Sequence, residues 1–230
     1  PWSAKLTFVE YTDKKPYFEA VFYSKEEFEA LENAYKTQKD KDTGVSLYER
    51  FEKMKAKAFQ KGIRKDDYIK STNHTEIRYS YNDLEEFVTD LNNDKAVKAK
   101  YTPFVKEVHV YVNDKSIEKF RIVDTPGLHD TNVINSLETS KWVTKTHALI
   151  FLLPPKGITE DDYEFLKEYQ AAKGPEGRIF VINRIDESSV EEAARVRTFL
   201  KELGAEHRFK EINMFGFNEV ICRYSSYAKM

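Results

Sequence analysis

The sequence contains almost no cysteine and no long apolar run. Cys222 is the single cysteine among 230 residues, which excludes an internal disulfide and favours a reducing compartment such as the cytoplasm. No apolar run approaches the roughly 18 residues that a membrane-spanning helix requires. Hydrophobic residues nevertheless make up 40% and charged residues 33% of the chain, which excludes a disordered protein. We therefore expect a globular protein.

Neither sign of charge dominates. The chain carries 37 basic and 39 acidic side chains, for a formal net charge of −2. Such a balance produces no general field that would attract nucleic acid or anionic lipid, so we expect no nucleic-acid partner, and any membrane contact must be local. A mass of 27.0 kDa is sufficient for one large domain.

The amino-terminal part begins with two strand patterns and a helix start. Residues 4–11 and 17–23 alternate apolar and polar positions around a polar turn, which predicts a β-hairpin. The pattern then changes to helical spacing at Ser24, and Glu27 completes an S-x-x-E capping box. A helix is predicted to begin there.

Helical spacing continues in the next segments. It returns over residues 45–61 and again over 82–91, where Asn82 is a candidate cap. The expected apolar faces contain Phe28, Leu31 and Tyr35 in the first helix, Leu47, Phe51, Met54 and Phe59 in the second, and Leu84, Phe87, Val88 and Leu91 in the third. We interpret about 24–98 as a helical insertion.

The remainder alternates strands with helices. Apolar strand patterns are "FVKEVHVYV", "KFRIVD", "HALIFLLP", "GRIFVINRID" and "NEVICRYSS". Helices are predicted over 131–146, 159–172 and 189–203, the last opened by "SSVEE". This alternation predicts an α/β fold, with a mostly parallel sheet covered by helices on both faces.

Polar residues follow these strands at the ends where ligands bind in such sheets. Asp124 ends "FRIVD", and a carboxylate there suits the water shell of a Mg²⁺ ion. Gly127 follows in "DTPG", where the missing Cβ lets a backbone N–H approach a terminal phosphate. The alternative is an ordinary strand-to-loop turn.

A second polar group follows the strand "GRIFVI". Asn183 can hydrogen-bond a purine ring, Asp186 can accept two N–H bonds from the edge of guanine, and the stem of Arg184 can cover the base. Ser225 and Ser226, after "NEVIC", are candidates to meet the guanine carbonyl. Helix caps are the alternative for both groups, but the order of the motifs favours a nucleotide site.

"VDTPGLHD" followed by "NRID" resembles the GTP-binding domain of the dynamin superfamily, especially bacterial dynamin-like proteins. The resemblance covers nearly the whole chain, including "PWSAKLTFVEY", "YTPFVKEVHVYV" and "THALIFLL". It implies a P-loop GTPase-type fold and Mg²⁺-dependent hydrolysis of GTP to GDP. In that family Asp124 would be the magnesium-shell acid, Gly127 would contact the γ-phosphate, and Thr125 and Pro126 would complete this nucleotide-binding loop. Ser3, in "PWSA", falls where the family has the threonine that binds Mg²⁺ and orients the attacking water.

The same resemblance implies that Asn183, Arg184 and Asp186 read guanine, with Ser225 and Ser226 in the last, loosest element. It also implies a homodimer or a paralogue heterodimer through the GTPase domain. Membrane remodelling or fusion would use regions outside this chain, at the inner face of a membrane.

One family element is missing from these residues: no GxxxxGK[ST] phosphate loop occurs in the 230 residues. We therefore expect residues 1–230 to be a partial GTPase domain that lacks the first strand and the phosphate loop, and to bind GTP poorly alone. The alternative is a degenerate, nucleotide-independent scaffold with the same fold. A small regulatory or ribosome-associated GTPase fits the motifs but leaves little room for the segment 24–98.

Overall fold

The protein is described here from a computed structural model. It describes residues 5–37, 46–89, 99–126, 145–153 and 178–182, and single positions at 142, 189, 191, 192, 194, 195 and 198. The chain divides into two compact units, Pro1–Thr139 and Ser140–Met230. Each unit is described by itself.

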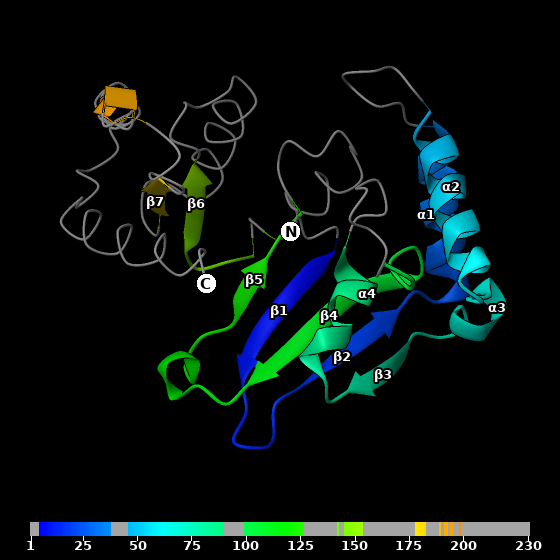
Figure 1. Ribbon diagram of the computed structural model, residues 1–230, viewed down its shortest axis with the longest axis horizontal. Coiled ribbons are helices and arrows are strands. Elements are labelled where there is room, and N and C mark those ends of the chain that lie inside the picture. Colours follow the sequence, from blue (N-terminus) through cyan, green and yellow to red (C-terminus); the bar gives the residue numbers. More distant parts are fainter. Residues whose placement is uncertain are drawn as a thin grey trace. The chain divides into compact units, whose positions relative to one another are not determined.

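The first unit contains a five-stranded sheet with the order β3-β2-β4-β1-β5 (Figure 1). Its strands are β1 (Leu6–Tyr11), β2 (Tyr17–Phe22), β3 (His74–Arg78), β4 (Val105–Val112) and β5 (Ile122–Asp124). The α/β class is confirmed. However, the sheet is mixed, because only β1 and β4 run parallel and the other three pairings are antiparallel. Two strands that follow each other in the chain can run parallel in one sheet only if a long crossover joins them. The connection from β4 to β5 is too short for a crossover, so β5 runs antiparallel to β4 and to its neighbour β1.

The predicted hairpin between the first two strands is wrong, although both strands exist. β4 lies between β1 and β2, parallel to β1 and antiparallel to β2. Phe18 pairs with Val110 and Ala20 with Val108, so the inserted strand contributes valines to the same buried face as β2. Alternation within a strand predicts its faces, but it does not identify its neighbours.

Helices and helical turns cover one face of this sheet and bury an aromatic-rich core. They are α1 (Lys25–Thr37), α2 (Leu47–Gln60), α3 (Lys65–Tyr68), α4 (Glu85–Val88) and the 3₁₀ turn η1 (Tyr81–Asp83); a second 3₁₀ turn, η2 (Lys115–Ile117), lies in the connection from β4 to β5 and buries no residue. α1 and α2 lie side by side (Figure 1). Among the described residues, the largest fully buried side chains are Phe18, Phe22, Phe28, Phe51, Phe87, Phe104 and Leu47 in this core, and Phe8, which lies outside it.

The predicted capping box at the start of α1 is confirmed. The Glu27 N–H donates to Ser24 Oγ at 3.2 Å, and the Ser24 N–H donates to Glu27 Oε2 at 3.1 Å. These two bonds satisfy backbone donors that the first turn of a helix leaves without intrahelical partners. On the apolar face of α1, Phe28 and Tyr35 are buried and Leu31 is partly buried, as expected.

The predicted face of α2 needs one correction. Leu47 and Phe51 are buried, but Phe59 is 65% exposed and Ala58 takes the last core position. At about 100° per residue, Ala58 returns close to the direction of Leu47, whereas Phe59 points well away from it.

The insertion also departs from the helical prediction. It contains the strand β3, which pairs with β2. Phe87 is buried as expected, but a 3₁₀ turn precedes α4, and no side chain caps either element, so the predicted Asn82 cap is wrong.

In the second unit, β6 (Leu149–Leu153) and β7 (Arg178–Ile182) form a parallel pair, as the apolar runs predicted. The "SSVEE" signal is a second capping box, in which the Glu192 N–H donates to Ser189 Oγ at 3.2 Å. Most of the predicted helices at 131–146 and 159–172, and the strand "NEVICRYSS", lie outside the described residues. Among the described helices, none has the length and apolar character to cross a membrane.

Candidate functional site

Asp124 lies where the sequence predicted it, at the carboxyl end of a strand. It is the last residue of β5, its side chain is exposed, and it pairs in register with Thr7 of the antiparallel strand β1. After it, Thr125 is half-buried and Pro126 is buried. The strand therefore presents the carboxylate at the sheet edge, and the two residues that follow it are progressively more buried.

The other predicted site residues lie outside the part of the chain that the structure describes. They are Ser3, Gly127, Asn183, Arg184, Asp186, Ser225 and Ser226. The last described residue of β7 is Ile182, so the strand that precedes Asn183 in the sequence is confirmed. The roles of all seven residues stay predictions.

Within the described residues, no group of three or more His, Cys, Asp or Glu side chains could hold a metal ion. An exposed carboxylate such as Asp124 fits Mg²⁺, which keeps several waters and takes oxygen ligands from substrate phosphates. A Mg²⁺-phosphate group does not need a cage made entirely of protein ligands.

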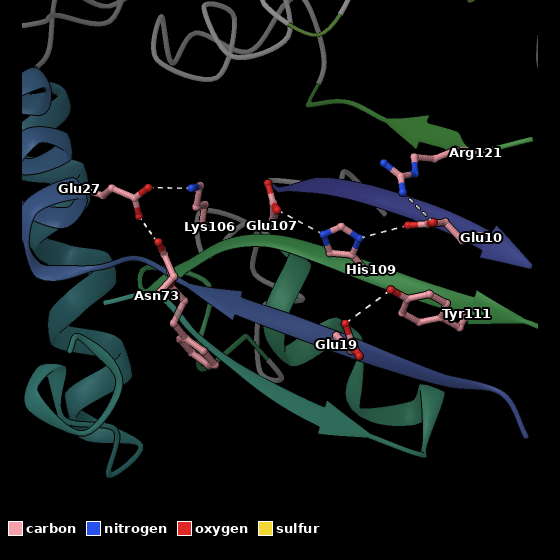
Figure 2. A network of polar contacts seen from close by, with 10 residues as sticks. Glu10, Glu19, Glu27, Asn73, Lys106, Glu107, His109, Tyr111 and Arg121 are labelled. Atoms are coloured by element: carbon pink, nitrogen blue, oxygen red, sulfur yellow. Dashed lines mark hydrogen bonds and ion pairs between the residues drawn. The ribbon is translucent and has the colours of Figure 1, made fainter. Parts of the chain in front are cut away.

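The structure also reveals a polar network that sequence reasoning missed, on the sheet face away from the buried valines (Figure 2). His109 of β4 lies between two carboxylates, with Nδ1 at 3.3 Å from Glu10 Oε1 and Nε2 at 3.2 Å from Glu107 Oε1. Arg121 Nη2 donates to the other oxygen of Glu10 at 2.9 Å. These contacts link β1, β4 and the residue that precedes β5.

Hydrogen bonding raises the pKa of His109 above its ordinary value. Glu107 is the largest cause, burial opposes it, and Glu10 adds to the rise. Below its raised pKa the imidazolium is a cation between two carboxylates, and the His109 ring also stacks on Phe8 with centroids 4.6 Å apart. The network is therefore most stable when His109 is protonated.

A tyrosine group lies farther along the same face. The Tyr111 hydroxyl donates to Glu19 Oε2 at 3.5 Å, and its ring stacks on Tyr17 at 4.5 Å (Figure 2). Burial, together with Glu19 and Glu10, raises the pKa of Tyr111 to about 12. Tyr111 is therefore neutral at physiological pH and acts as a hydrogen-bond donor.

A separate junction surrounds Glu27. Besides its bond to Ser24, Glu27 accepts from Asn73 Nδ2, and its other oxygen lies 2.7 Å from Lys106 Nζ. Burial would raise the pKa of Glu27, but hydrogen bonds from Lys106, Asn73 and Ser24 outweigh it and lower the pKa. The start of α1 is thus tied to both β4 and the residue that precedes β3.

A weak sequence signal exists for the His109 network. Glu107, His109 and Tyr111 occupy alternate positions of β4, so period-two alternation places them on one face. Their partners Glu10 and Arg121 come from distant segments, and no pattern in the sequence pairs β1 with β4.

Comparison with known proteins identifies a similar fold. No family model and no curated protein matches the chain. A solved structure described as an oligomerised bacterial dynamin pair, with a mechanism for long-range sensing and tethering of membranes, matches with a TM-score of 0.60 and 19% identity. A second structure with the same description matches with a TM-score of 0.58 and 20% identity.

These matches cover most of this chain but a smaller part of the neighbours. The first covers 93% of this chain and 27% of the neighbour, and the second covers 92% and 32%. The chain thus spans about a third or less of the proteins that it resembles. At this level of identity the likeness concerns architecture, and the fold of this chain is dynamin-like.

Proposed function

We propose that this chain is part of a dynamin-like GTPase, which binds GTP and hydrolyses its γ-phosphate bond with Mg²⁺. The observation that carries the proposal is the position of Asp124, the first residue of the sequence motif "DTPG", at the carboxyl end of β5, in a chain whose fold is dynamin-like. Phosphoryl transfer of this kind depends mainly on positioning and on neutralising charge, so the site needs few reacting side chains.

On the phosphate side, Asp124 holds the water shell of Mg²⁺ and the Gly127 N–H contacts the γ-phosphate. Ser3 supplies an oxygen to Mg²⁺ and orients the attacking water. The register supports this grouping, because Thr7 lies opposite Asp124 and the four-residue step back to Ser3 spans at most about 14 Å. The segment that contains Ser3 can therefore reach the edge where β5 ends.

On the base side, Asp186 accepts the N1 and 2-amino protons of guanine, Asn183 bonds the purine ring, and the Arg184 stem covers the base. Ser225 and Ser226 complete the guanine pocket. The parallel pair β6 and β7 supports this assignment, since residue 183 directly follows β7 and ligands bind beyond the carboxyl ends of parallel strands.

The solved neighbours are described as an oligomerised pair that senses and tethers membranes. We propose that this protein likewise associates as a homodimer or with a paralogue, and that it works at the inner face of a bacterial membrane in remodelling or fusion. Membrane contact would come from regions other than these residues.

GTP turnover by the full-length protein tests the proposal, with Asp124→Ala and Asp186→Asn as variants. Asp124→Ala should reduce turnover strongly. Asp186→Asn should move preference from GTP toward xanthosine triphosphate, because the new amide can donate to the xanthine carbonyl. If Asp186→Asn left the preference unchanged, the guanine role of Asp186 would have to be dropped.

A scaffold that does not bind nucleotide is the second candidate, favoured by the lack of a phosphate-loop sequence in these 230 residues. Calorimetric titration of the full-length protein with GTP and Mg²⁺ separates the two functions. Saturable heat that disappears in Asp124→Ala supports the GTPase, whereas no heat at any concentration supports the scaffold.

A further inference from the structure

Strand β5, which ends at Asp124, is held by a short ladder. Three residue pairs join it to β1: Val9 with Ile122, Phe8 with Val123, and Thr7 with Asp124. Among the described strands, β1 is its only partner, so β5 forms one edge of the sheet. So short an edge strand needs further contacts to keep its register.

Arg121 supplies two such contacts immediately before β5. Its guanidinium donates to Glu10 Oε2 at 2.9 Å, which continues the ladder by one cross-strand pair (Figure 2). The guanidinium carbon also lies 5.9 Å from the ring centroid of Phe8, a buried residue of the same strand. An ion pair and a cation–π contact together fix both the position and the orientation of the arginine.

Glu10 is oriented in turn by His109. One carboxylate oxygen of Glu10 contacts His109 and the other contacts Arg121, so both of its oxygens are occupied. Other charged groups near His109 are Glu107 on β4 and Glu19 on β2, which lies opposite His109 in the register. Arg121 therefore binds a carboxylate that the central strand already holds in place.

We propose that Arg121 and Glu10 are positioning residues that hold β5 in register and so fix the Asp124 carboxylate at the sheet edge, with His109 as the support for Glu10. The role of Asp124 toward Mg²⁺ rests on the proposed function. The proposal that Arg121 and Glu10 keep β5 in register is independent of that function, because it follows from contacts within the sheet.

The sheet contains a matched control for Arg121. Arg78, at the end of β3 on the opposite edge, contacts Glu76 at 2.6 Å, and its guanidinium carbon lies 5.9 Å from the Phe87 ring centroid. Arg78→Gln also removes an ion pair and a cation–π contact, far from Asp124 in the strand order, but its ion pair lies within β3 and joins no neighbouring strand. A loss of protection in β5 that Arg121→Gln causes and Arg78→Gln does not is therefore attributed to the cross-strand contacts of Arg121.

Hydrogen–deuterium exchange on the full-length protein measures the hold on β5 directly. Arg121→Gln should raise the exchange rate of residues 122–124 about three-fold, the scale of a partly exposed ion pair, and leave β3 unchanged. Arg78→Gln should affect β3 and the α4 segment that contains Phe87, and leave residues 122–124 unchanged. Glu10→Gln should also raise the exchange rate of β5, and the double variant should show less than the sum of the two single effects, because the two changes share the Arg121–Glu10 ion pair.

GTP turnover at varied Mg²⁺ concentration tests the positioning role. Arg121→Gln should raise the Mg²⁺ concentration at half-maximal rate about three-fold while the rate at saturating Mg²⁺ is kept, and Arg78→Gln should change neither. If Arg121→Gln left the exchange rate of β5 unchanged, the proposal that Arg121 keeps β5 in register would be overturned. If exchange in β5 became faster but the Mg²⁺ dependence of turnover did not change, the positioning role toward Asp124 would be overturned. If the unmodified protein turned over no GTP, the proposed function would fail, and the exchange comparison would still decide the hold on β5.

Discussion

Replacing Glu27 with alanine should destabilise the first unit by about 2 kcal/mol. The variant loses the acceptor for the Ser24 N–H, a capping bond that contributes about 1 kcal/mol. It also loses the bond from Asn73, which contributes about 1 kcal/mol. The Lys106 pair adds less, about 0.5 kcal/mol, because both side chains are partly exposed, at 34% and 37%. Contacts that share one carboxylate are not fully additive, so the expected total cost is somewhat below the sum of these contributions, at about 2 kcal/mol.

The pH dependence gives this prediction a second signature. The folded-state pKa of Glu27 is lowered, so its charged form contributes stability above the ordinary value of 4.5. That contribution disappears as the pH falls through the lowered folded pKa. Glu27→Gln, which keeps the size of the side chain, should therefore be less stable than the unmodified protein at neutral pH and should approach it in acid.

Urea unfolding followed by circular dichroism measures both effects at a series of pH values. Ser189 and Glu192 form a capping box with similar distances, 3.0 and 3.2 Å, and the neighbouring Glu191 side chain also hydrogen-bonds Ser189. Glu192→Ala is thus the control, and it should cost about 1 kcal/mol or less. If Glu27→Ala cost no more stability than Glu192→Ala, the idea that the contacts of Glu27 with Asn73 and Lys106 stabilise the first unit would be refuted.

Two further predictions concern the core of α2 and the His109 network. Phe51→Ala should lower the free energy of unfolding by about 3–5 kcal/mol, because Phe51 is 2% exposed and stacks on Tyr35. Phe59→Ala should change it by less than about 0.5 kcal/mol, because Phe59 is exposed. Equal costs of the two variants in urea unfolding would contradict the observed helix face. The folded-state pKa of His109 is raised above 6.5, so the stability that protonated His109 contributes is complete below 6.5 and is lost as the pH rises through the raised pKa. His109→Gln should abolish this pH-dependent part of the unfolding free energy. An unchanged pH profile in urea unfolding would show that Glu10 and Glu107 do not stabilise the imidazolium.

Several local features were predicted correctly where neighbouring residues decide them, although the Asn82 cap was not. Ser24 and Glu27 are three residues apart, and their reciprocal bonds involve only the first turn of α1. The apolar runs likewise predicted β4, β6 and β7, because an apolar run or an alternation of side chains is visible within a single strand. The error at Phe59 shows the limit: two adjacent apolar residues were available, and Ala58 belongs to the buried core cluster whereas Phe59 is exposed.

In the candidate site, too, the residues within one segment could be predicted and the contacts between distant segments could not. Asp124 and its loop could be found from "IVDTPG", because a strand followed by an acid, a proline and a glycine is a local pattern. Glu10, His109 and Arg121 could not be found this way. Each is an ordinary polar residue in its own segment, and only the register of β1 with β4 and β5 brings them together.

The sequence by itself determined most of the strands, the capping boxes at Ser24 and Ser189, and which strand carries the acid of the proposed phosphate site, whereas it missed β3. These features depend on short-range sterics and on hydrogen bonds between near neighbours. The tertiary structure decided the strand order, which places β4 between β1 and β2 and leaves β5 at the edge. That order depends on contacts between segments about a hundred residues apart, such as those of Glu10 with His109 and Arg121, and each segment carries only half of every such pair.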